Sequence, residues 1–472
     1  SLMLSTLECI FRGERNLFKG LAIDKLDYDW QSYPVLQFSF AGVKTESLEV
    51  FKADFSSRVR KVLTEANYTW RDEDFVSANF NQAIGELAKQ AGKPVVLLID
   101  EYDAPVNRAM KDIAKATAIR DELADFYIQI KECASNIRFM MMTGVTKYAQ
   151  LSVFSALNNL NDLTLQPEAA TLLGYSDEEL DAYFAPSLQA HAKAMGLSDA
   201  DYRAELRHWY NGYRFSPWAT TTVYNPVAIA RTLSRRLPVF ETTWSETGHA
   251  SALMRYLERE SLADKDYDRL PPVGKRIFDS YNLATLRPET VLYQTGYLTI
   301  KDFIPPSLYV LGVPDEDVRQ DLNSLLLNKA LGSDANETSD NIQSALLTGD
   351  FPAFFARLKA FYAHLPYGAK EGPVHEAAYQ RALYALLSAG GLRVTAEDRQ
   401  SQGRADLVAE SMDQVYIFEL KIRGTAAEAL AQIHEKGYAK PYLLPGKTVH
   451  LIGLAFDPAS NTLTDAAEET LA

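Results

Sequence analysis

Three short apolar segments, separated by helical stretches, constrain the fold of the first third of the chain. They read YPVLQFSF (33–40), PVVLLID (94–100) and IRFMMMTGV (137–145). Apolar residues recur with helical spacing before and between them, over 2–12, 46–65 and 73–91. Short buried strands that alternate with helices are typical of a parallel sheet covered on both faces. We therefore predict an α/β fold for this region.

The sequence pattern changes three times along the 472 residues, which indicates four parts. Residues 1–165 form the predicted α/β core. Residues 166–260 are helical and rich in aromatic side chains, as expected of a helical lid. Residues 261–372 are a mixed connecting region, and residues 373–472 begin a new, compact pattern.

Within the connecting region, the segment LYQTGYLTI (292–300) is predicted to be a strand. The polar stretch LGSDANETSD (331–340) contains few apolar residues and predicts a flexible connector. PYGAKEGP (366–373) marks the expected boundary before the last part.

Composition excludes several classes of protein. The hydrophobic fraction of 47% is that of a globular chain. No run of 18 apolar residues is present and the N-terminus lacks the features of a signal peptide, so we expect a cytoplasmic protein. Two cysteines cannot build a disulfide framework or a Cys-rich zinc site. A net charge of −14 argues against a surface that coats nucleic acid, so a polyanion must bind at a confined site.

The last hundred residues predict the order α-β-β-β-α-β. The elements are expected at 374–389, 392–397, 404–410, 415–421, 426–438 and 448–456. A capping box formed by Thr425 and Glu428 marks the start of the second helix. The four-residue loop 411–414 joins the second and third strands as a hairpin.

Hairpin pairing around this loop brings three charged side chains to one face of the sheet. Residue 410 faces 415 and 408 faces 417, so Asp406 is expected directly opposite Glu419. Lys421 joins them because strand side chains alternate with period two. Two facing carboxylates repel unless a proton or a cation lies between them.

A divalent cation with hard oxygen preferences suits this arrangement. Mg²⁺ is commonly held by one or two carboxylates, and the carbonyl of Leu420 could add a third protein oxygen. Lys421 could then orient an attacking water and offset charge on a phosphate. The alternative is a solvated surface, on which Asp406 pairs with Arg404 or Lys421 at little energetic gain.

This region resembles the PD-(D/E)XK nuclease superfamily over roughly residues 373–456, with Asp406, Glu419 and Lys421 at its motif positions. The resemblance implies that Glu376 is a further acidic metal ligand and that Gln432 steadies the site. A helix-dipole partner and an exposed helix residue remain the respective alternatives. The family's Pro-Asp pair is replaced by Ala405-Asp406, which weakens the motif but keeps the carboxylate.

The front part carries acidic residues directly after a buried strand. In P-loop ATPases the strand-end Asp of the Walker B position holds Mg²⁺ through water, and an adjacent Glu polarises the attacking water. Asp100 and Glu101 occupy such places in VVLLIDEYD, with Asp103 nearby. Caps for the next helix are the alternative. Thr143, at the end of the third strand, is expected beside Asp100, either as a sensor-like residue or as a strand-end hydroxyl.

The order of motifs resembles an AAA-ATPase-like family in which such an ATPase precedes a PD-(D/E)XK domain. The motifs are LLIDEYDAPVN, TGVTKYAQLSVFSALNNL, LGYSDEEL, WYNGYRF, YNP and QTGYLTI, within residues 1–320. The resemblance implies a P-loop-type parallel sheet, a helical lid and an ATP–Mg site. Ser1 matches the hydroxyl residue that would ligate Mg²⁺.

The phosphate loop itself, G-x-x-x-x-G-K-[ST], does not occur in this sequence. LPGKTVH (444–450) lacks the first Gly and leads into a strand, so we reject it. Two explanations stay open: the loop belongs to residues before Ser1 that are absent from this sequence, or the natural protein has dispensed with it.

These observations predict a Mg²⁺- or Mn²⁺-dependent nuclease-like hydrolase that acts on nucleic acid, for which we expect DNA, coupled to an incomplete ATPase-like module. The alternative is a nucleotide-dependent switch or a DNA- or partner-binding protein without cleavage. The aromatic cluster Trp209, Tyr210, Tyr213 and Phe215, beside Arg207 and Arg214, is interpreted as packing core, with base stacking as the alternative. No membrane partner is expected, and an oligomer is compatible with the sequence.

Without the loop's backbone N–H groups and Lys, nucleotide phosphates lose most of their binding energy. We therefore expect no appreciable ATP hydrolysis by the chain of residues 1–472. Phosphate release measured with ATP and Mg²⁺ tests this. Turnover that Glu101→Gln abolishes would contradict it.

Overall fold

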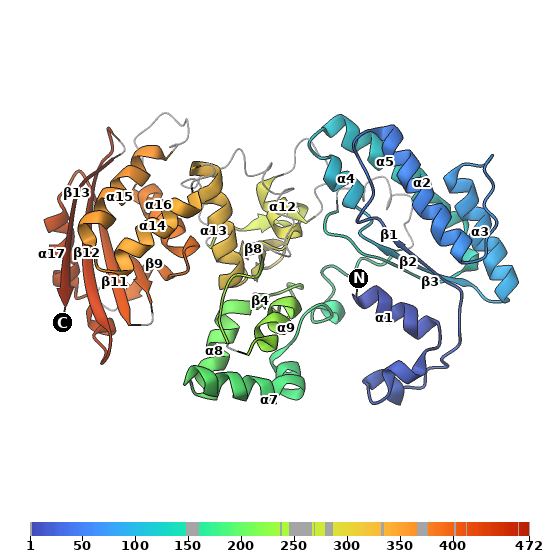
Figure 1. Ribbon diagram of the computed structural model, residues 1–472, viewed down its shortest axis with the longest axis horizontal. Coiled ribbons are helices and arrows are strands. Elements are labelled where there is room, and N and C mark those ends of the chain that lie inside the picture. The colour runs from blue at the N-terminus through green and yellow to red at the C-terminus, as the bar shows by residue number, and fades with distance from the viewer. Residues whose placement is uncertain are drawn as a thin grey trace. The chain divides into compact units, whose positions relative to one another are not determined.

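The chain forms two compact units, and the first combines two separate segments of the sequence. Unit 1 comprises Ser1–Asp162 and Lys275–Thr295, and unit 2 comprises Leu163–Gly274 and Gly296–Ala472. Figure 1 shows the elements of the computed structural model. The structure describes residues 2–147, 160–236, 238–244, 267–268, 270–278, 287–331, 335–365, 376–400, 403–411, 413–460 and 462–471.

Unit 1 contains the predicted parallel sheet. Its strands β1 (Val35–Ser39), β2 (Val95–Asp100) and β3 (Ile137–Met142) run parallel in the order β1-β2-β3. The central strand β2 is buried along its whole length, as its uninterrupted apolar sequence requires. The helices are α1 (Leu2–Phe11), α2 (Leu48–Glu65), α3 (Val76–Ala91), α4 (Ala104–Ala109), α5 (Ile113–Glu132) and α12 (Pro288–Gln294).

Helices cover both faces of this sheet (Figure 1). Val96 and Leu98 point to one face, where they pack against Leu4 and Phe11 of α1. On β1, Phe38 lies in ring contact with aromatic residues of α3 and α5. Burial of alternating side chains on opposite faces therefore fixes the helices to the sheet.

Unit 2 begins with a helical part and two small sheets. The helices are α7 (Asp177–Met195), α8 (Asp199–Tyr210), α9 (Pro226–Ser234) and, further along, α13 (Glu316–Leu331), α14 (Ala335–Leu347) and α15 (Phe351–His364). The small sheets contain β4 (Asn211–Tyr213), β5 (Val223–Tyr224), β6 (Val273–Gly274), β7 (Thr299–Ile304) and β8 (Leu308–Gly312). The strand predicted at LYQTGYLTI (292–300) is wrong for most of its length, because residues 292–294 end helix α12 and only Thr299 and Ile300 belong to β7. Among the described residues, no helix is both long and apolar enough to cross a bilayer.

The flexible connector predicted at 331–340 is wrong where the structure describes it. Helix α14 begins at Ala335, and only residues 332–334 lie outside the described part. The polar residues form the first turns of an amphipathic helix whose apolar anchors, Ile342 and Leu346, come later and are fully buried. The boundary predicted at 366–373 lies outside the described residues.

The last part of unit 2 confirms the predicted order α-β-β-β-α-β and adds one strand. Its elements are α16 (Glu376–Ala389), β9 (Arg393–Gln400), β10 (Gly403–Glu410), β11 (Gln414–Ile422), α17 (Ala426–Lys436), β12 (Thr448–Asp457) and β13 (Thr462–Leu471). The sheet order is β13-β12-β11-β10-β9, with β11 and β12 parallel and the other neighbours antiparallel. The capping box of Thr425 and Glu428 is confirmed at the start of α17. Sequence patterning missed β13 because it is an edge strand with a largely polar sequence.

Gly144, which follows β3, gives a test of the packing in unit 1. A Cβ at this position would lie 2.3 Å from Oδ1 of Asp103 and 2.6 Å from the ring of Tyr102. We predict that Gly144→Ala lowers the free energy of unfolding by about 1–3 kcal/mol, as overpacking does. Urea titration measures the change.

Gly85 provides the matched control, because it lies inside α3 and a Cβ there meets only Asn136, at 3.9 Å. Gly85→Ala should raise the free energy of unfolding by roughly 0.5–1 kcal/mol, since Ala is the better helix former. Equal urea midpoints for the two variants would contradict the packing explanation.

Candidate active site

The predicted hairpin register is confirmed up to the point where β10 and β11 separate. The ladder of the described hairpin includes Glu410↔Val415 and Val408↔Ile417 and ends with Leu407↔Phe418. The expected direct pairing of Asp406 with Glu419 would lie beyond this last pair. Over the same stretch β10 continues to pair with β9, as in Ala405↔Asp398. The sheet therefore forks between β10 and β11 at the predicted site.

The side chain of Asp406 crosses this fork. Its Oδ2 accepts a hydrogen bond from the backbone N–H of Leu420 at 2.7 Å. A carboxylate thus takes the place that a carbonyl oxygen of β10 holds in a continuing ladder. The charge of Asp406 also raises the pKa of Glu419, so the two carboxyl groups share one electrostatic environment.

Glu419, Lys421 and Gln432 form a hydrogen-bonded network beside Asp406. Lys421 Nζ lies 2.9 Å from Glu419 Oε1 and 2.7 Å from Gln432 Oε1. The Nε2 of Gln432 donates to the same oxygen of Glu419. Gln432 reaches the network from α17, which Ile433 anchors against buried residues of β11 and β12. The sequence predicted each of these three residues, and the fold brings them together.

The carboxyl group of Glu419 is the most perturbed group of the network. Glu419 is 2% exposed, and burial, followed by the nearby Asp406 carboxylate, raises the pKa of Glu419 to about 7. The neighbouring Lys421 opposes this shift. Oε2 of Glu419 is buried without a hydrogen-bond partner, which leaves one anionic oxygen for a cation or a proton.

Helix α16 contributes two further polar residues. Glu376, the first residue of the helix, is exposed, and its charge is among those that raise the pKa of Glu419. Gln380 was not predicted, yet its Nε2 donates to the backbone carbonyl of Asp406. The spacing of four residues from Glu376 puts both on one helix face, and this was the available sequence signal.

The donor set fits a hard divalent cation. Asp406 and Glu419 provide carboxylate oxygens, and Mg²⁺ needs only one or two carboxylates because it keeps several waters. The orphaned Oε2 of Glu419 supports this fit. Within the described residues, no group of three or more His, Cys, Asp and Glu side chains is close enough to hold a metal on its own.

In unit 1, Asp100 and Thr143 meet at the ends of β2 and β3. Thr143 Oγ1 donates to Asp100 Oδ1 at 2.8 Å, as the shared strand edge predicts. Glu101 follows with a left-handed backbone, φ +50°. Asp103 does not cap its helix: it accepts hydrogen bonds from Val145 N at 3.2 Å and Thr146 N at 2.5 Å. Ser1 lies outside the described residues.

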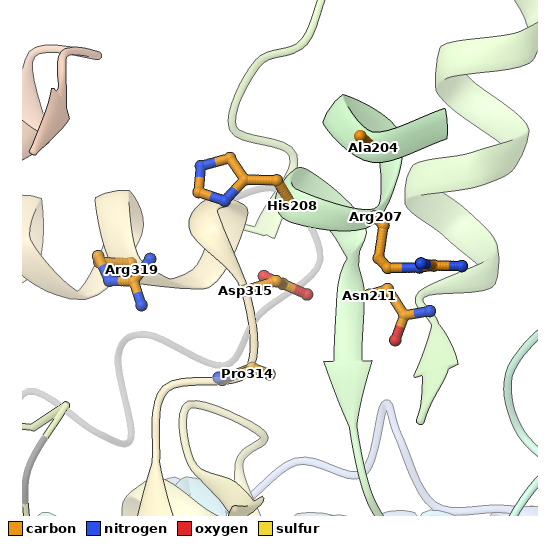
Figure 2. A pocket seen from close by; sticks show the side chains of 7 residues that line it. All are labelled: Ala204, Arg207, His208, Asn211, Pro314, Asp315 and Arg319. Carbon is orange, nitrogen blue, oxygen red and sulfur yellow. The ribbon is translucent and has the colours of Figure 1, made fainter. Parts of the chain in front are cut away.

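A separate polar cavity opens in unit 2 between the end of α8 and the start of α13 (Figure 2). Burial raises the pKa of Asp315 to about 8 and lowers that of His208 to about 4, which favours the neutral forms of both groups. Arg207 pairs with Asp177 at 2.7 Å. The lining residues are Ala204, Arg207, His208, Asn211, Pro314, Asp315 and Arg319, of which only Arg207, beside the aromatic cluster, was singled out from the sequence.

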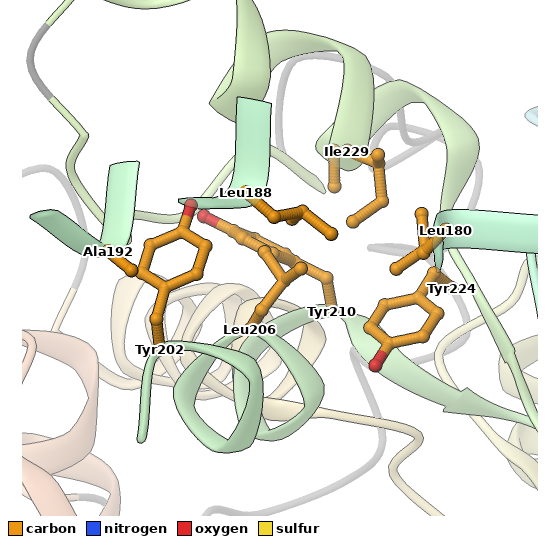
Figure 3. Close-up of a cluster of buried hydrophobic side chains, with 9 residues drawn as sticks. Leu180, Leu188, Ala192, Tyr202, Leu206, Tyr210, Tyr224 and Ile229 are labelled. Carbon is orange, nitrogen blue, oxygen red and sulfur yellow. The ribbon is translucent and has the colours of Figure 1, made fainter. Parts of the chain in front are cut away.

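The opposite side of α8 packs into a hydrophobic core (Figure 3). Tyr202, Leu206 and Tyr210 of this helix are almost fully buried together with residues of α7 and α9. Tyr213 is buried as well, and Arg214 donates to backbone carbonyls, including that of Pro217 at 2.7 Å. The structure thus supports the packing interpretation of this aromatic cluster.

Comparisons with known proteins agree with both ends of the chain. A family model described as Predicted AAA-ATPase matches residues 1–154, and a model of the PD-(D/E)XK nuclease superfamily matches residues 374–466. A protein of Azotobacter chroococcum mcd 1, described as "Uncharacterized protein in vnfD 5'region", is 31% identical over 490 residues, which cover 100% of this chain and 90% of that protein. No solved structure matches the chain. From the identity along the whole chain and the order of the two domains, we conclude that the protein belongs to the AAA-ATPase-like family whose members carry a C-terminal PD-(D/E)XK nuclease superfamily domain.

Proposed function

We propose that the C-terminal domain hydrolyses phosphodiester bonds of nucleic acid at the fork between β10 and β11. The observation that carries the proposal is the network of Glu419, Lys421 and Gln432, held beside the carboxylate of Asp406. A buried, perturbed carboxyl group next to a lysine is an arrangement expected of a reactive site. A solvated surface pair would not bury Glu419 to 2% exposure.

Asp406 and Glu419 would hold Mg²⁺ or Mn²⁺. Glu376 forms no three-residue metal group with them in the described part of the chain, so it would have to move towards the fork to join as a further acidic ligand. The bound cation supplies a Lewis acid for the phosphate and lowers the pKa of a coordinated water. The unpartnered Oε2 of Glu419 supports the assignment of this metal site, and the backbone carbonyl of Leu420 would be a further oxygen ligand. The binding carboxylates must be ionised, so cation binding competes with the proton on Glu419.

We assign to Lys421 a direct role at the attacking water and the phosphate. Its amine donates to Glu419 Oε1 and Gln432 Oε1, and these two hydrogen bonds fix its direction with two of its three N–H donors. From this position it would orient the attacking water and offset the charge that develops on the phosphate. Gln432 has no reactive group, so we assign it to holding Lys421 and Glu419 in register.

For unit 1 we propose an ATP–Mg site that requires the phosphate loop. Asp100 is buried and bonded to Thr143, so its carboxylate is fixed at the sheet edge where such sites place the cation. Glu101 would polarise water, and Ser1 would supply the hydroxyl ligand. Nucleotide binding there would control the nuclease-like domain.

A second candidate is a switch or nucleic-acid-binding protein that does not cleave. The observation that favours it is that the described residues gather no complete group of three metal-ligating side chains. For either candidate we propose a nucleic-acid partner, with DNA as the first to test. The chain is acidic overall, so binding must use local Lys and Arg residues.

The role of Lys421 predicts a loss of cleavage in Lys421→Ala. Wild type with Mn²⁺ should cleave at least one of single-stranded DNA, double-stranded DNA and RNA, and the variant should be slower by about a hundredfold or more, the usual effect of a positioned proton-transfer group. Removal of the metal by a chelator should abolish cleavage. Gel analysis of end-labelled substrates measures the rates.

Lys447→Ala is the matched control, because it removes the same charge at the closed end of the β10–β11 hairpin, where Lys447 Nζ donates to the carbonyl of Ser411. It should cleave at the wild-type rate. Equal rates for wild type and Lys421→Ala would exclude the proposed reaction.

The raised pKa of Glu419 predicts that cation binding depends on pH. Below about pH 7 the carboxyl group carries a proton that competes with the metal. A fixed Mn²⁺ concentration should therefore raise the melting temperature strongly at pH 8 and progressively less as the pH falls through 7. Asp406→Ala should show little shift at any pH. If Mn²⁺ and Mg²⁺ shift neither protein, the metal site is excluded.

In metal-free protein, the contribution of Glu419 to stability should change with pH in the opposite direction, falling as the pH rises. Folding raises the pKa of Glu419 above its ordinary 4.5, so protonation stabilises the fold below that value and the contribution is lost as the pH rises through about 7. Glu419→Gln removes this dependence. Relative to wild type, the variant should become more stable as the pH rises from 5 to 8, which urea titration at each pH measures.

A further inference from the structure

The reaction proposed above does not use Gln380, although this residue touches the backbone of the site. Gln380 lies in the second turn of α16, and its Nε2 donates to the backbone carbonyl of Asp406. Asp406 is the residue whose carboxylate crosses the fork to Leu420 N. A helix outside the hairpin therefore holds the peptide that carries a proposed metal ligand.

Helix α16 is itself fixed in unit 2, so it can act as a rigid support. The hydroxyl of Tyr384 donates to Asp268 Oδ2 at 2.9 Å, and Asn323 Nδ2 donates to Ser388 Oγ at 3.0 Å. Ser339 Oγ donates to the carbonyl of Leu386 at 3.1 Å. The apolar face of the helix, including Tyr379 and Leu383, is fully buried. The position of α16, which carries Gln380, is therefore set by contacts other than the one to Asp406.

The backbone around Asp406 explains what this bond does. Ala405 and Leu407, on either side of it, pair with Asp398 and Ala396 of β9. A backbone carbonyl requires a donor when buried, and Gln380 supplies one from the helix. Because the carbonyl of Asp406 points to α16, its carboxylate can accept the hydrogen bond from Leu420 N. In this position, after burial, the charge of the carboxylate contributes to the raised pKa of Glu419.

We infer that Gln380 is a positioning residue, which orients Asp406 across the fork by bonding its backbone carbonyl. The inference rests on the proposed function, since it assigns Asp406 to the metal site. Loss of the bond should release the carboxylate from Leu420 N and weaken cation binding, while the rest of β11 stays paired with β12.

The test compares Gln380→Met, which keeps the length of the side chain but removes the donor, with wild type. Loss of one hydrogen bond predicts changes of about tenfold. The amide of Leu420 should exchange with solvent about tenfold faster in metal-free protein, with Tyr416 in the middle of β11 unchanged. The Mn²⁺ concentration at half-maximal melting shift should rise by a similar factor. Gln380→Glu, which keeps the shape of the side chain but also lacks the amide donor, serves as a second variant in the same two measurements.

Lys447→Met is the matched control. Lys447 Nζ donates to the carbonyl of Ser411 at 3.1 Å, so it makes the same kind of bond at the closed end of the same hairpin. In Lys447→Met, the exchange rate of the Leu420 amide and the Mn²⁺ concentration at half-maximal melting shift should both equal the wild-type values. An unchanged Leu420 exchange rate in Gln380→Met, or an equal change in Lys447→Met, overturns the inference. The wild-type protein could bind Mn²⁺ and yet cleave no substrate. If Leu420 then exchanges faster in Gln380→Met but not in Lys447→Met, the positioning role of Gln380 is supported and only the proposed cleavage is overturned.

Discussion

The candidate site depends on one hydrogen bond, in which the carboxylate of Asp406 accepts from the backbone N–H of Leu420. Strand β11 is buried at this point, and a buried amide without an acceptor costs on the order of 1–3 kcal/mol. When β10 leaves the ladder after Leu407, its side chain replaces the missing backbone partner. The fork can therefore open without leaving β11 unsatisfied, and Glu419 stays buried beside it.

Period-two alternation and the loop length were sufficient to predict the hairpin and its three charged residues. The register from Glu410 to Val408 follows from the loop, and Lys421 shares a face with Glu419 for the same reason. The end of the ladder could not be predicted, nor could the hydrogen bond that Asp406 accepts there from Gln380, which is 26 residues distant in the chain. Contacts of this kind leave no periodic signal.

Similar reasons separate the correct and incorrect predictions elsewhere. The contact of Thr143 with Asp100 was predictable because parallel strands end at one sheet edge. A helix cap was the alternative interpretation of the acidic residues after β2, yet the carboxylate of Asp103 binds the backbone after β3. Helix α14 was missed because its polar first turns precede its apolar anchors. Local patterns record which face is buried, whereas the partner of a buried polar group is decided by tertiary structure.

Both candidate sites lie where a buried strand ends, and this position has a chemical consequence. Asp100 and Glu419 are each largely excluded from water, and each is held by neighbouring donors instead. Such donors keep a carboxylate in place but do not neutralise it fully, as the raised pKa of Glu419 and its unpartnered Oε2 demonstrate. A cation that replaces the proton on Glu419 would remove the repulsion from Asp406 that burial intensifies. The same desolvation that makes the metal-free carboxyl pair unfavourable therefore favours cation binding at the fork.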